Sequence, residues 1–284
     1  MMIRMILMGA ILILLLLLIL KKGGVEAPTS ETRYVQTPDK RQVVYWPAEH
    51  NQLVHYSTHS LSYNPEHRQA DWVAYILTSE DFGTTEEIPL EYTKDPDMED
   101  VAHPDDYLAG DYVMGQLISY EERSGHPEGT QEIFYMSNVS PQKKGFNQGV
   151  WRELKENVRD WTHASGRLYI VTGPVLNDEL KKVVDSQVSV PDYFFKVILD
   201  LDSTEPKMLG FLIPNEETSE PLESFAQTVS AIEELTQIDF FKSILLDQKL
   251  EESLEGDFDM AQWPVDQDRY QRRVERWHQI KSKE

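Results

Sequence analysis

Side chains able to bind a cation or a phosphate are concentrated between Ser137 and Arg159. Asn138, Gln142 and Asn147 supply amide groups within the first half of this stretch. Amide and carboxylate oxygens are the ligands that hard cations such as Mg²⁺ prefer in proteins. A polar turn that satisfies its own backbone would use the same residue types. The segment therefore predicts either a cation site or a hydrogen-bonded turn.

Basic side chains are interleaved with these amides. They are Lys143, Lys144, Arg152, Lys155 and Arg159. We expect Lys143, Lys144 and Arg152 to be the foremost phosphate ligands, although a solvated loop and helix face would carry similar charges.

The elements expected to position these groups are a strand before them and a helix after them. The apolar run Ile133–Met136 predicts the strand. Apolar residues at helical spacing predict a helix over Trp151–Ala164. Further strands are expected at 43–46, Leu53–Tyr56, Ser60–Tyr63, Arg167–Thr172, Tyr193–Leu201 and Met208–Ile213. Further helices are expected at Thr228–Leu235, with Ser230 as a candidate N-cap, and at Gln248–Leu254.

The order and spacing of these residues resemble the metal-binding segment of the DNA/RNA non-specific endonucleases, the ββα-metal nucleases. The matching residues are Ser137-Asn138, Pro141-Gln142, Asn147-Gln148-Gly149 and Trp151. Other stretches are similar to the bacterial branch of that family, namely Ser60–Leu77, Leu168–Leu176, Val190–Asp200, Gly210–Glu216 and Ile232–Phe241. The resemblance covers about Tyr56 to Trp263.

This resemblance implies an α/β fold, or α+β in some schemes, with a central mixed, mainly antiparallel sheet flanked by helices. It implies divalent-metal-dependent hydrolysis of nucleic-acid phosphodiesters, with Mg²⁺ or Mn²⁺ as the cofactor and DNA or RNA as the substrate. Asn147 falls on the family's metal-ligand position, and Asn138 and Gln142 fall on supporting positions.

The catalytic motif of the family is altered in this chain. Its Tyr-Asp-Arg-Gly-His-Leu signature falls on Tyr112–Leu117, where Val113, Met114 and Gln116 replace the aspartate, arginine and histidine. Lys155 occupies the helix position that resemblance assigns to a glutamate. An imidazole accepts a proton near neutral pH, whereas a glutamine amide does not. We therefore expect hydrolysis near background, with Gln116 and Asn147 facing a common cleft.

Three functions remain open at this point. The first is a nuclease-family protein with impaired catalysis. The second is an active nuclease in which Gln116 orients a water molecule, or in which His103 or His126 replaces the missing base. The third is a non-catalytic nucleic-acid or protein-binding scaffold at the cell envelope.

The composition limits these functions further. The net charge of −22 repels polyanions and weakens DNA or RNA binding outside a local basic patch. The absence of cysteine excludes disulfides, thiolate nucleophiles and cysteine-based zinc sites. Nothing in the composition specifies an oligomeric state.

The two ends of the chain differ from the central part. Residues 1–22 contain an apolar run of about 16 residues, which predicts a signal peptide or membrane anchor and an exported, periplasmic or extracellular location. Residues 23–42 read as a linker, and residues 43–263 as the endonuclease-like domain. Residues 264–284 predict a basic amphipathic helix. That helix either docks on the acidic domain or binds an anionic surface, lipid or nucleic acid.

Overall fold

The computed structural model describes residues 47–48, 51–83, 91–107, 112–126, 129–245 and 247–282. These residues belong to one unit, Thr37–Glu284. The expected signal or anchor segment, the linker and the strand at 43–46 lie outside the described residues. Within the part of the chain that is described, no helix has both the length and the apolar character needed to cross a bilayer.

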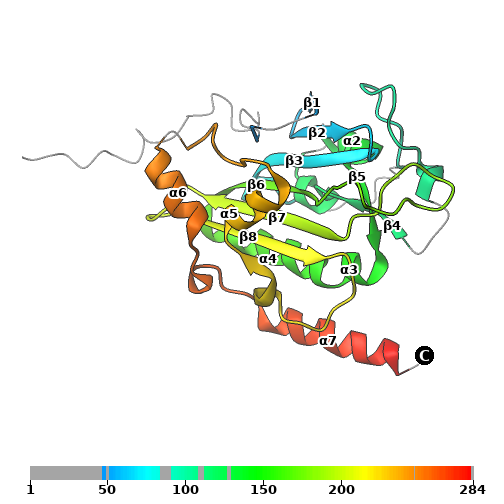
Figure 1. The fold of residues 1–284 in the computed structure, drawn as a ribbon. Coiled ribbons are helices and arrows are strands. Elements are labelled where there is room, and N and C mark those ends of the chain that lie inside the picture. Colours follow the sequence, from blue (N-terminus) through cyan, green and yellow to red (C-terminus); the bar gives the residue numbers. More distant parts are fainter. Residues whose placement is uncertain are drawn as a thin grey trace, which may run out of the picture. The chain divides into compact units, whose positions relative to one another are not determined.

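The centre of the fold is a seven-stranded sheet in the order β1-β2-β3-β6-β7-β8-β9 (Figure 1). Every pair of neighbouring strands is antiparallel. The strands are β1 (Gln52–His55), β2 (Ser60–Asn64), β3 (Gln69–Thr78), β6 (Arg167–Pro174), β7 (Tyr193–Asp200), β8 (Lys207–Pro214) and β9 (Ala226–Gln227). A separate two-stranded sheet joins β4 (Tyr112–Gln116) to β5 (Val139–Lys143).

Helices cover both faces of the central sheet, so its middle strands are almost continuously apolar. Along β7, Phe194 packs against Trp151 of α4 (Val150–Ser165), with ring centroids 5.9 Å apart. The next residue, Phe195, points to the opposite face and packs against Phe240 at 5.2 Å. This alternation is the ordinary consequence of the two-residue strand period.

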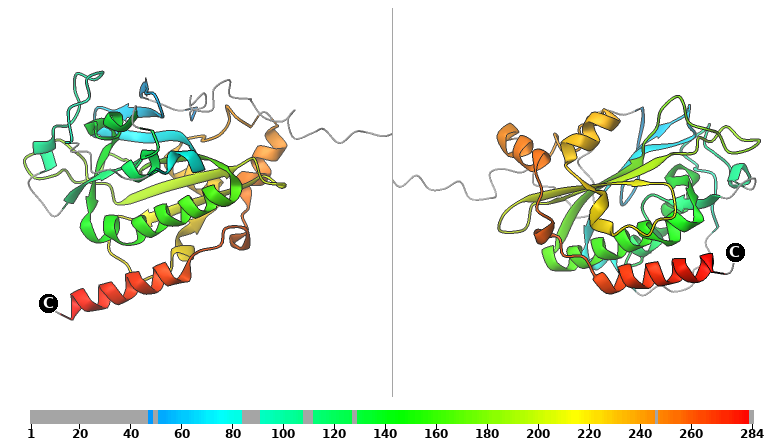
Figure 2. Two further views of the ribbon diagram at one scale, coloured as in Figure 1. Left: turned by 180° about the vertical axis from the view of Figure 1, so that it is seen from behind. Right: turned by 60° about the horizontal axis from the view of Figure 1, so that its bottom comes forward.

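Figure 2 shows the resulting layers. Helix α4 lies on one face of the sheet, while α5 (Val229–Thr236) and α6 (Gln248–Gly256) lie on the other. Helix α7 (Gln267–Lys281) runs along the outside of α4, away from the sheet. The remaining short elements are η2 (Ser79–Asp81), η3 (Pro104–Tyr107), η4 (Tyr120–Arg123), α2 (Thr130–Ile133), η6 (Met136–Asn138), α3 (Lys144–Gln148), η7 (Leu222–Phe225) and η8 (Met260–Gln262).

Two local predictions were wrong. Ile133–Met136 is not a strand: α2 ends at Ile133, and the strand β5 begins only at Val139. The apolar side chains of that run enter the core from helical turns, while pairing with β4 gives the more polar β5 its backbone partners. The N-cap of α5 is Thr228, whose hydroxyl accepts a hydrogen bond from the Ala231 amide at 3.3 Å, and not Ser230.

Candidate functional site

The candidate site is built on a hairpin followed by a helix. Strands β4 and β5 pair antiparallel, with Gly115 opposite Ser140 and Val113 opposite Gln142. From the end of β5 the chain turns directly into α3 and then α4. Asn147 lies in α3, at the junction between the hairpin and the long helix.

Close packing of β4 against β5 fixes the Asn147 side chain. A Cβ atom on Gly115 would lie 2.1 Å from Cδ of Gln142, so only glycine leaves room for that side chain. Oε1 of Gln142 accepts a hydrogen bond of 2.6 Å from Nδ2 of Asn147. With this amide orientation, Oδ1 of Asn147 has no hydrogen-bond partner among the described residues. Asn147 can therefore offer one oxygen to a ligand.

Asn138 has a supporting role in the same unit. Its buried side chain accepts a hydrogen bond from the Ile118 amide and donates to the carbonyl oxygens of Ile118 and Ile133, at 2.8 to 3.0 Å. These contacts hold the end of β4 against the turn before β5. The side chains of Asn138 and Gln142 thus hold the backbone of the hairpin and the Asn147 amide in place.

A cavity of about 400 Å³ opens beside Asn147, and we call it the α4 cavity. Its lining combines residues of α3, α4 and η4 with the end of the η2 turn. They are Phe82, Ser119, Glu121, Glu122, Asn147, Gln148, Arg152, Lys155, Glu156 and Arg159. Arg152 pairs with Glu156 at 2.9 Å, whereas Lys155 and Arg159 form no ion pair within the described residues. Two cations of the α4 cavity, Lys155 and Arg159, are therefore available to a ligand, beside the carboxylates of Glu121, Glu122 and Glu156.

A buried polar chain supports the wall of the α4 cavity. Lys196 of β7 donates a 2.8 Å hydrogen bond to the Tyr75 hydroxyl, which donates one of 2.7 Å to Glu122. All three side chains are buried. Burial lowers the pKa of Lys196 to about 8, against the opposing attraction of Glu122. Burial alone would raise the pKa of Glu122, but the Lys196 and Lys155 cations and hydrogen bonds from Ser119 and Tyr75 hold it below its usual value.

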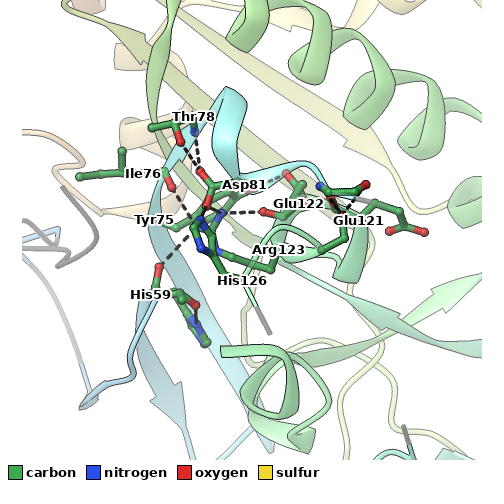
Figure 3. A network of polar contacts seen from close by, with 12 residues as sticks. His59, Tyr75, Ile76, Thr78, Asp81, Glu121, Glu122, Arg123 and His126 are labelled. Carbon is green, nitrogen blue, oxygen red and sulfur yellow. Dashed lines mark hydrogen bonds and ion pairs between the residues drawn. The ribbon is translucent and has the colours of Figure 1, made fainter. Parts of the chain in front are cut away.

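Figure 3 shows a second network of polar contacts, which joins Asp81 of η2, Arg123 of η4 and His126. Arg123 pairs with Asp81 at 3.1 Å and donates to the Ile76 carbonyl at 2.9 Å. His126 also contacts Asp81, at 3.0 Å. Burial and the Arg123 cation lower the pKa of the neighbouring His59 to about 3. These groups fix η4 and the η2 turn, which together form one wall of the α4 cavity.

The structure brings together only part of the predicted site. Asn147, Arg152, Lys155 and Arg159 line the α4 cavity, but Gln116 is not among its lining residues. The Gln116 amide instead donates to the Ile133 carbonyl and accepts from the Tyr120 amide, both at 3.2 Å.

The other predicted groups lie elsewhere. Lys143 pairs with Glu216 at 2.8 Å, and Lys144 is exposed. His103 pairs with Asp105 in an exposed loop, and His126 belongs to the Asp81 network. Among the residues that the structure describes, no histidine lines the α4 cavity.

Glu122 and Lys196 were not anticipated as a connected pair. One sequence signal was present, because Lys196 interrupts the otherwise apolar run of β7. A lysine on a strand that is buried on both faces requires a polar partner. The sequence does not reveal which residue is that partner, because Glu122 is distant from Lys196 in the sequence and the tertiary fold alone brings the two together.

Asn147 and Glu122 by themselves fit at most a weakly held hard cation. Asn147 offers one neutral oxygen, while the Glu122 carboxylate already accepts hydrogen bonds from Tyr75 and from the Ser119 amide and hydroxyl. Lys155 adds positive charge at the same cavity. Mg²⁺ is usually held by one or two carboxylates together with water and phosphate oxygens.

A mainly antiparallel α+β fold with a strand–strand–helix site defines the class of ββα-metal nucleases. The model of the DNA/RNA non-specific endonuclease family matches residues 38–246. The chain therefore belongs to the DNA/RNA non-specific endonuclease family.

Individual relatives agree with this assignment. The chain is 29% identical over 207 residues to the mitochondrial nuclease EXOG of Danio rerio, an alignment that covers 66% of this chain and 60% of that protein. It is 28% identical over 217 residues to a nuclease of Syncephalastrum racemosum, covering 68% of each. The aligned part is thus about three fifths of the length of the zebrafish relative.

The fold has a counterpart among solved structures. A chain of the crystal structure described as the EndoG/EndoGI complex, with the mechanism of EndoG inhibition, superposes with a TM-score of 0.67 at 24% identity. The match covers 75% of this chain and 96% of that chain. It supports the fold.

Proposed function

We propose that this protein binds the phosphate backbone of nucleic acids at the α4 cavity and hydrolyses phosphodiesters only near the background rate. The main support for this proposal is the hydrogen bonding of Gln116, which occupies the position where the family resemblance places the general base. Both ends of its amide are engaged by backbone groups, at Ile133 and Tyr120. An amide has no basicity near neutral pH, so it cannot take a proton from water.

The buried carboxylate of the α4 cavity does not supply the missing base. Glu122 is the buried carboxylate of the cavity, and its lowered pKa makes it a poor proton acceptor at neutral pH. Lys155 replaces the helix carboxylate that the resemblance implies. General-base catalysis is typically worth about 10² to 10⁴ in rate, and the loss of several cooperating groups is not additive.

Anion binding is supported by the charges that remain. Lys155 and Arg159 have no ion-pair partner among the described residues, and Arg152 has only an exposed pairing with Glu156. Such exposed pairs contribute little, so a phosphate competes readily for the guanidinium. Mg²⁺ or Mn²⁺ would be held through Oδ1 of Asn147, and when bound would neutralise phosphate charge and polarise water.

The test is a paired measurement of cleavage and binding. Purified protein is incubated with plasmid DNA or RNA and Mg²⁺ or Mn²⁺, and binding of a labelled duplex is followed by fluorescence anisotropy. We expect binding at low salt without cleavage above background. The variant Arg152→Ala/Lys155→Ala/Arg159→Ala should bind at least tenfold more weakly at low salt, because each phosphate contact contributes about 0.9 to the slope of log affinity against log salt.

A restored variant provides the complementary control. This variant should cleave faster than wild type without binding more tightly. It combines four substitutions: Val113→Asp, Met114→Arg, Gln116→His and Lys155→Glu. Wild-type cleavage at rates typical of active nucleases would overturn the proposal. So would an absence of binding at low salt.

The cellular location belongs to the same proposal. The apolar segment at residues 1–22 supports export, with retention as a membrane anchor if it is not cleaved. Fractionation of cells that express the full chain with a C-terminal tag tests this. Recovery in the cytosolic fraction at full mass would contradict export.

A further inference from the structure

Free basic side chains are unevenly distributed on this acidic molecule. Most described lysines and arginines are ion-paired or hydrogen-bonded. The exposed or half-exposed ones that make neither kind of contact within the described residues are Lys144, Lys155, Arg159, Lys181, Lys249, Arg272 and Arg276. All except Lys181 and Lys249 belong to α3, α4 or α7. The free positive charge therefore gathers on three helices.

Helix α7 is fixed to α4 through its own arginines. Arg273 is buried, and its guanidinium donates to Glu153 of α4 and to the carbonyl oxygens of Thr218 and Glu220, at 2.5 to 2.6 Å. Arg269 pairs with Asp160 at 2.7 Å and with Glu156 at 3.5 Å. Later residues of α7 thus meet earlier residues of α4, so the two helices are antiparallel, as Figures 1 and 2 show.

This arrangement orients the free arginines of α7. Arg272 and Arg276 follow Arg269 by three and seven residues, which places them on the same side of a helix. Arg269 contacts Glu156, and Glu156 also lines the α4 cavity. Arg272 and Arg276 are exposed. They therefore continue, along α7, the side of the molecule on which Lys155 and Arg159 face the α4 cavity.

We propose that Arg272 and Arg276 form a second phosphate-binding strip beside the α4 cavity, so that α7 extends the surface bound by one nucleic-acid duplex. This inference rests on the proposed function. Each pair of cations, Lys155 and Arg159 on α4 and Arg272 and Arg276 on α7, spans about 6 Å along its helix, at 1.5 Å per residue. Two such pairs on neighbouring helices offer several contacts to a backbone that carries one charge per about 1.7 Å of duplex axis.

The exposed side of α7 favours nucleic acid over a lipid surface. An interfacial helix binds a membrane by inserting its apolar face. In α7 the apolar residues Tyr270, Val274 and Trp277 are only partly exposed, whereas Arg272 and Arg276 are exposed. Tyr270 also donates a 3.2 Å hydrogen bond to the Ser219 carbonyl, which turns this side toward the domain. The exposed side chains described on α7 therefore include no apolar residue, and they carry Arg272 and Arg276 together with the acids Asp268 and Glu275.

The experiment compares two variants of equal charge. A labelled duplex of about 30 base pairs is titrated with three proteins between about 20 and 200 mM salt. They are the wild-type full chain, the arginine variant Arg272→Ala/Arg276→Ala and the lysine variant Lys181→Ala/Lys249→Ala. Each lost phosphate contact should reduce the slope of log affinity against log salt by about one. We expect the arginine variant to lose about two units of slope, while the lysine variant keeps the wild-type slope.

The outcomes separate this inference from the proposed function. If the wild-type chain does not bind the duplex, both fail. If the triple variant in the α4 cavity weakens binding and the arginine variant keeps the wild-type slope, only the role of α7 is overturned. Anionic vesicles are tested in parallel. Loss of vesicle binding in the arginine variant, with its duplex slope unchanged, would assign α7 to lipid and overturn the inference. Circular dichroism checks that each variant is folded.

Discussion

Lys196 shows how a single buried residue can influence the candidate site. Its ammonium group lies between the sheet and α4, with Nζ 5.5 Å from the centre of the Trp151 ring. Removing a charge from water is costly unless partners compensate. Tyr75 and Glu122 provide this compensation, and Glu122 forms part of the α4 cavity wall. The charge buried in the core thus contributes to the lowered pKa of a carboxyl group at the α4 cavity, against the opposing effect of burial.

His59 gives a prediction about acid stability. Burial and the Arg123 cation lower its pKa to about 3, against about 6.5 in an unfolded chain. Between these values the unfolded chain binds a proton that the folded chain does not, so stability falls as the pH falls below about 6.5. His59→Phe keeps a ring to stack on Tyr56 and removes the titration. The variant should lose about 3 kcal/mol less stability than wild type between pH 6.5 and pH 4.

Chemical denaturation across that pH range measures the effect. The variant itself will have a different stability at neutral pH, since Thr58 loses its contact with the imidazole. Only the change with pH is therefore compared. Parallel loss of stability in wild type and variant would show that His59 is protonated in the folded protein.

At the scale of elements, the β4–β5 hairpin determines what Asn147 can do. Its geometry depends on the absence of a side chain at Gly115, across which Gln142 lies. Gln142 is completely buried and holds the Asn147 amide. The glycine is therefore needed for close approach of a side chain, and no unusual backbone angle at this position has to be invoked.

Gly115→Ala tests this dependence. The added methyl would lie 2.1 to 2.5 Å from three Gln142 atoms, so Gln142 must move and release Asn147. We expect a loss of about 1 to 3 kcal/mol in the free energy of unfolding, as for other overpacked sites. Gly256→Ala is a matched control, because nothing lies within 4 Å of its added methyl. That variant should be neutral or slightly more stable.

A double variant shows whether the clash is the cause. Gly115→Ala/Gln142→Ala removes the atoms that the new methyl meets. Its stability should exceed the value expected from adding the two single losses. Additive losses in thermal or chemical unfolding would mean that Gly115 matters for a reason other than the Gln142 side chain.

The sequence predicted most elements because burial dictates their periodicity. The apolar spacing of Trp151, Leu154 and Val158 gave α4, and the apolar runs gave β6, β7 and β8. Ile133–Met136 was mistaken for a strand because a short apolar run has the same composition in either state.

The site was only partly predictable. The spacing of Arg152, Lys155 and Arg159 at three- and four-residue intervals was enough to place these cations on one side of α4, and Asn147 lies just before them in α3. The direction of the Gln116 amide depends on the distant carbonyl of Ile133, which local sequence does not reveal.

At the scale of the whole molecule, the dominant property is the net charge of −22. This field opposes the approach of a polyanion and concentrates divalent cations diffusely around the protein. Screening at physiological ionic strength limits these effects to about 8 Å. Binding of nucleic acid must therefore depend on the local charge of α3, α4 and α7, and apparent metal binding will include a diffuse contribution from the acidic surface.

Metal binding at Asn147 can be separated from that diffuse contribution by substitution at one atom. Thermal unfolding is measured with and without about 10 mM Mn²⁺ for wild type, Asn147→Ala and Asn147→Asp. A site with a dissociation constant of about 1 mM would add about 1.4 kcal/mol, which raises Tm by a few degrees. We expect the shift to be smallest for the alanine variant and largest for the aspartate variant, whose carboxylate is a better ligand for a hard cation. Since diffuse binding depends on the acidic surface as a whole, it changes little when a single residue is replaced. Equal shifts in all three proteins would therefore place the bound ions on the general surface and remove Asn147 from the set of ligands.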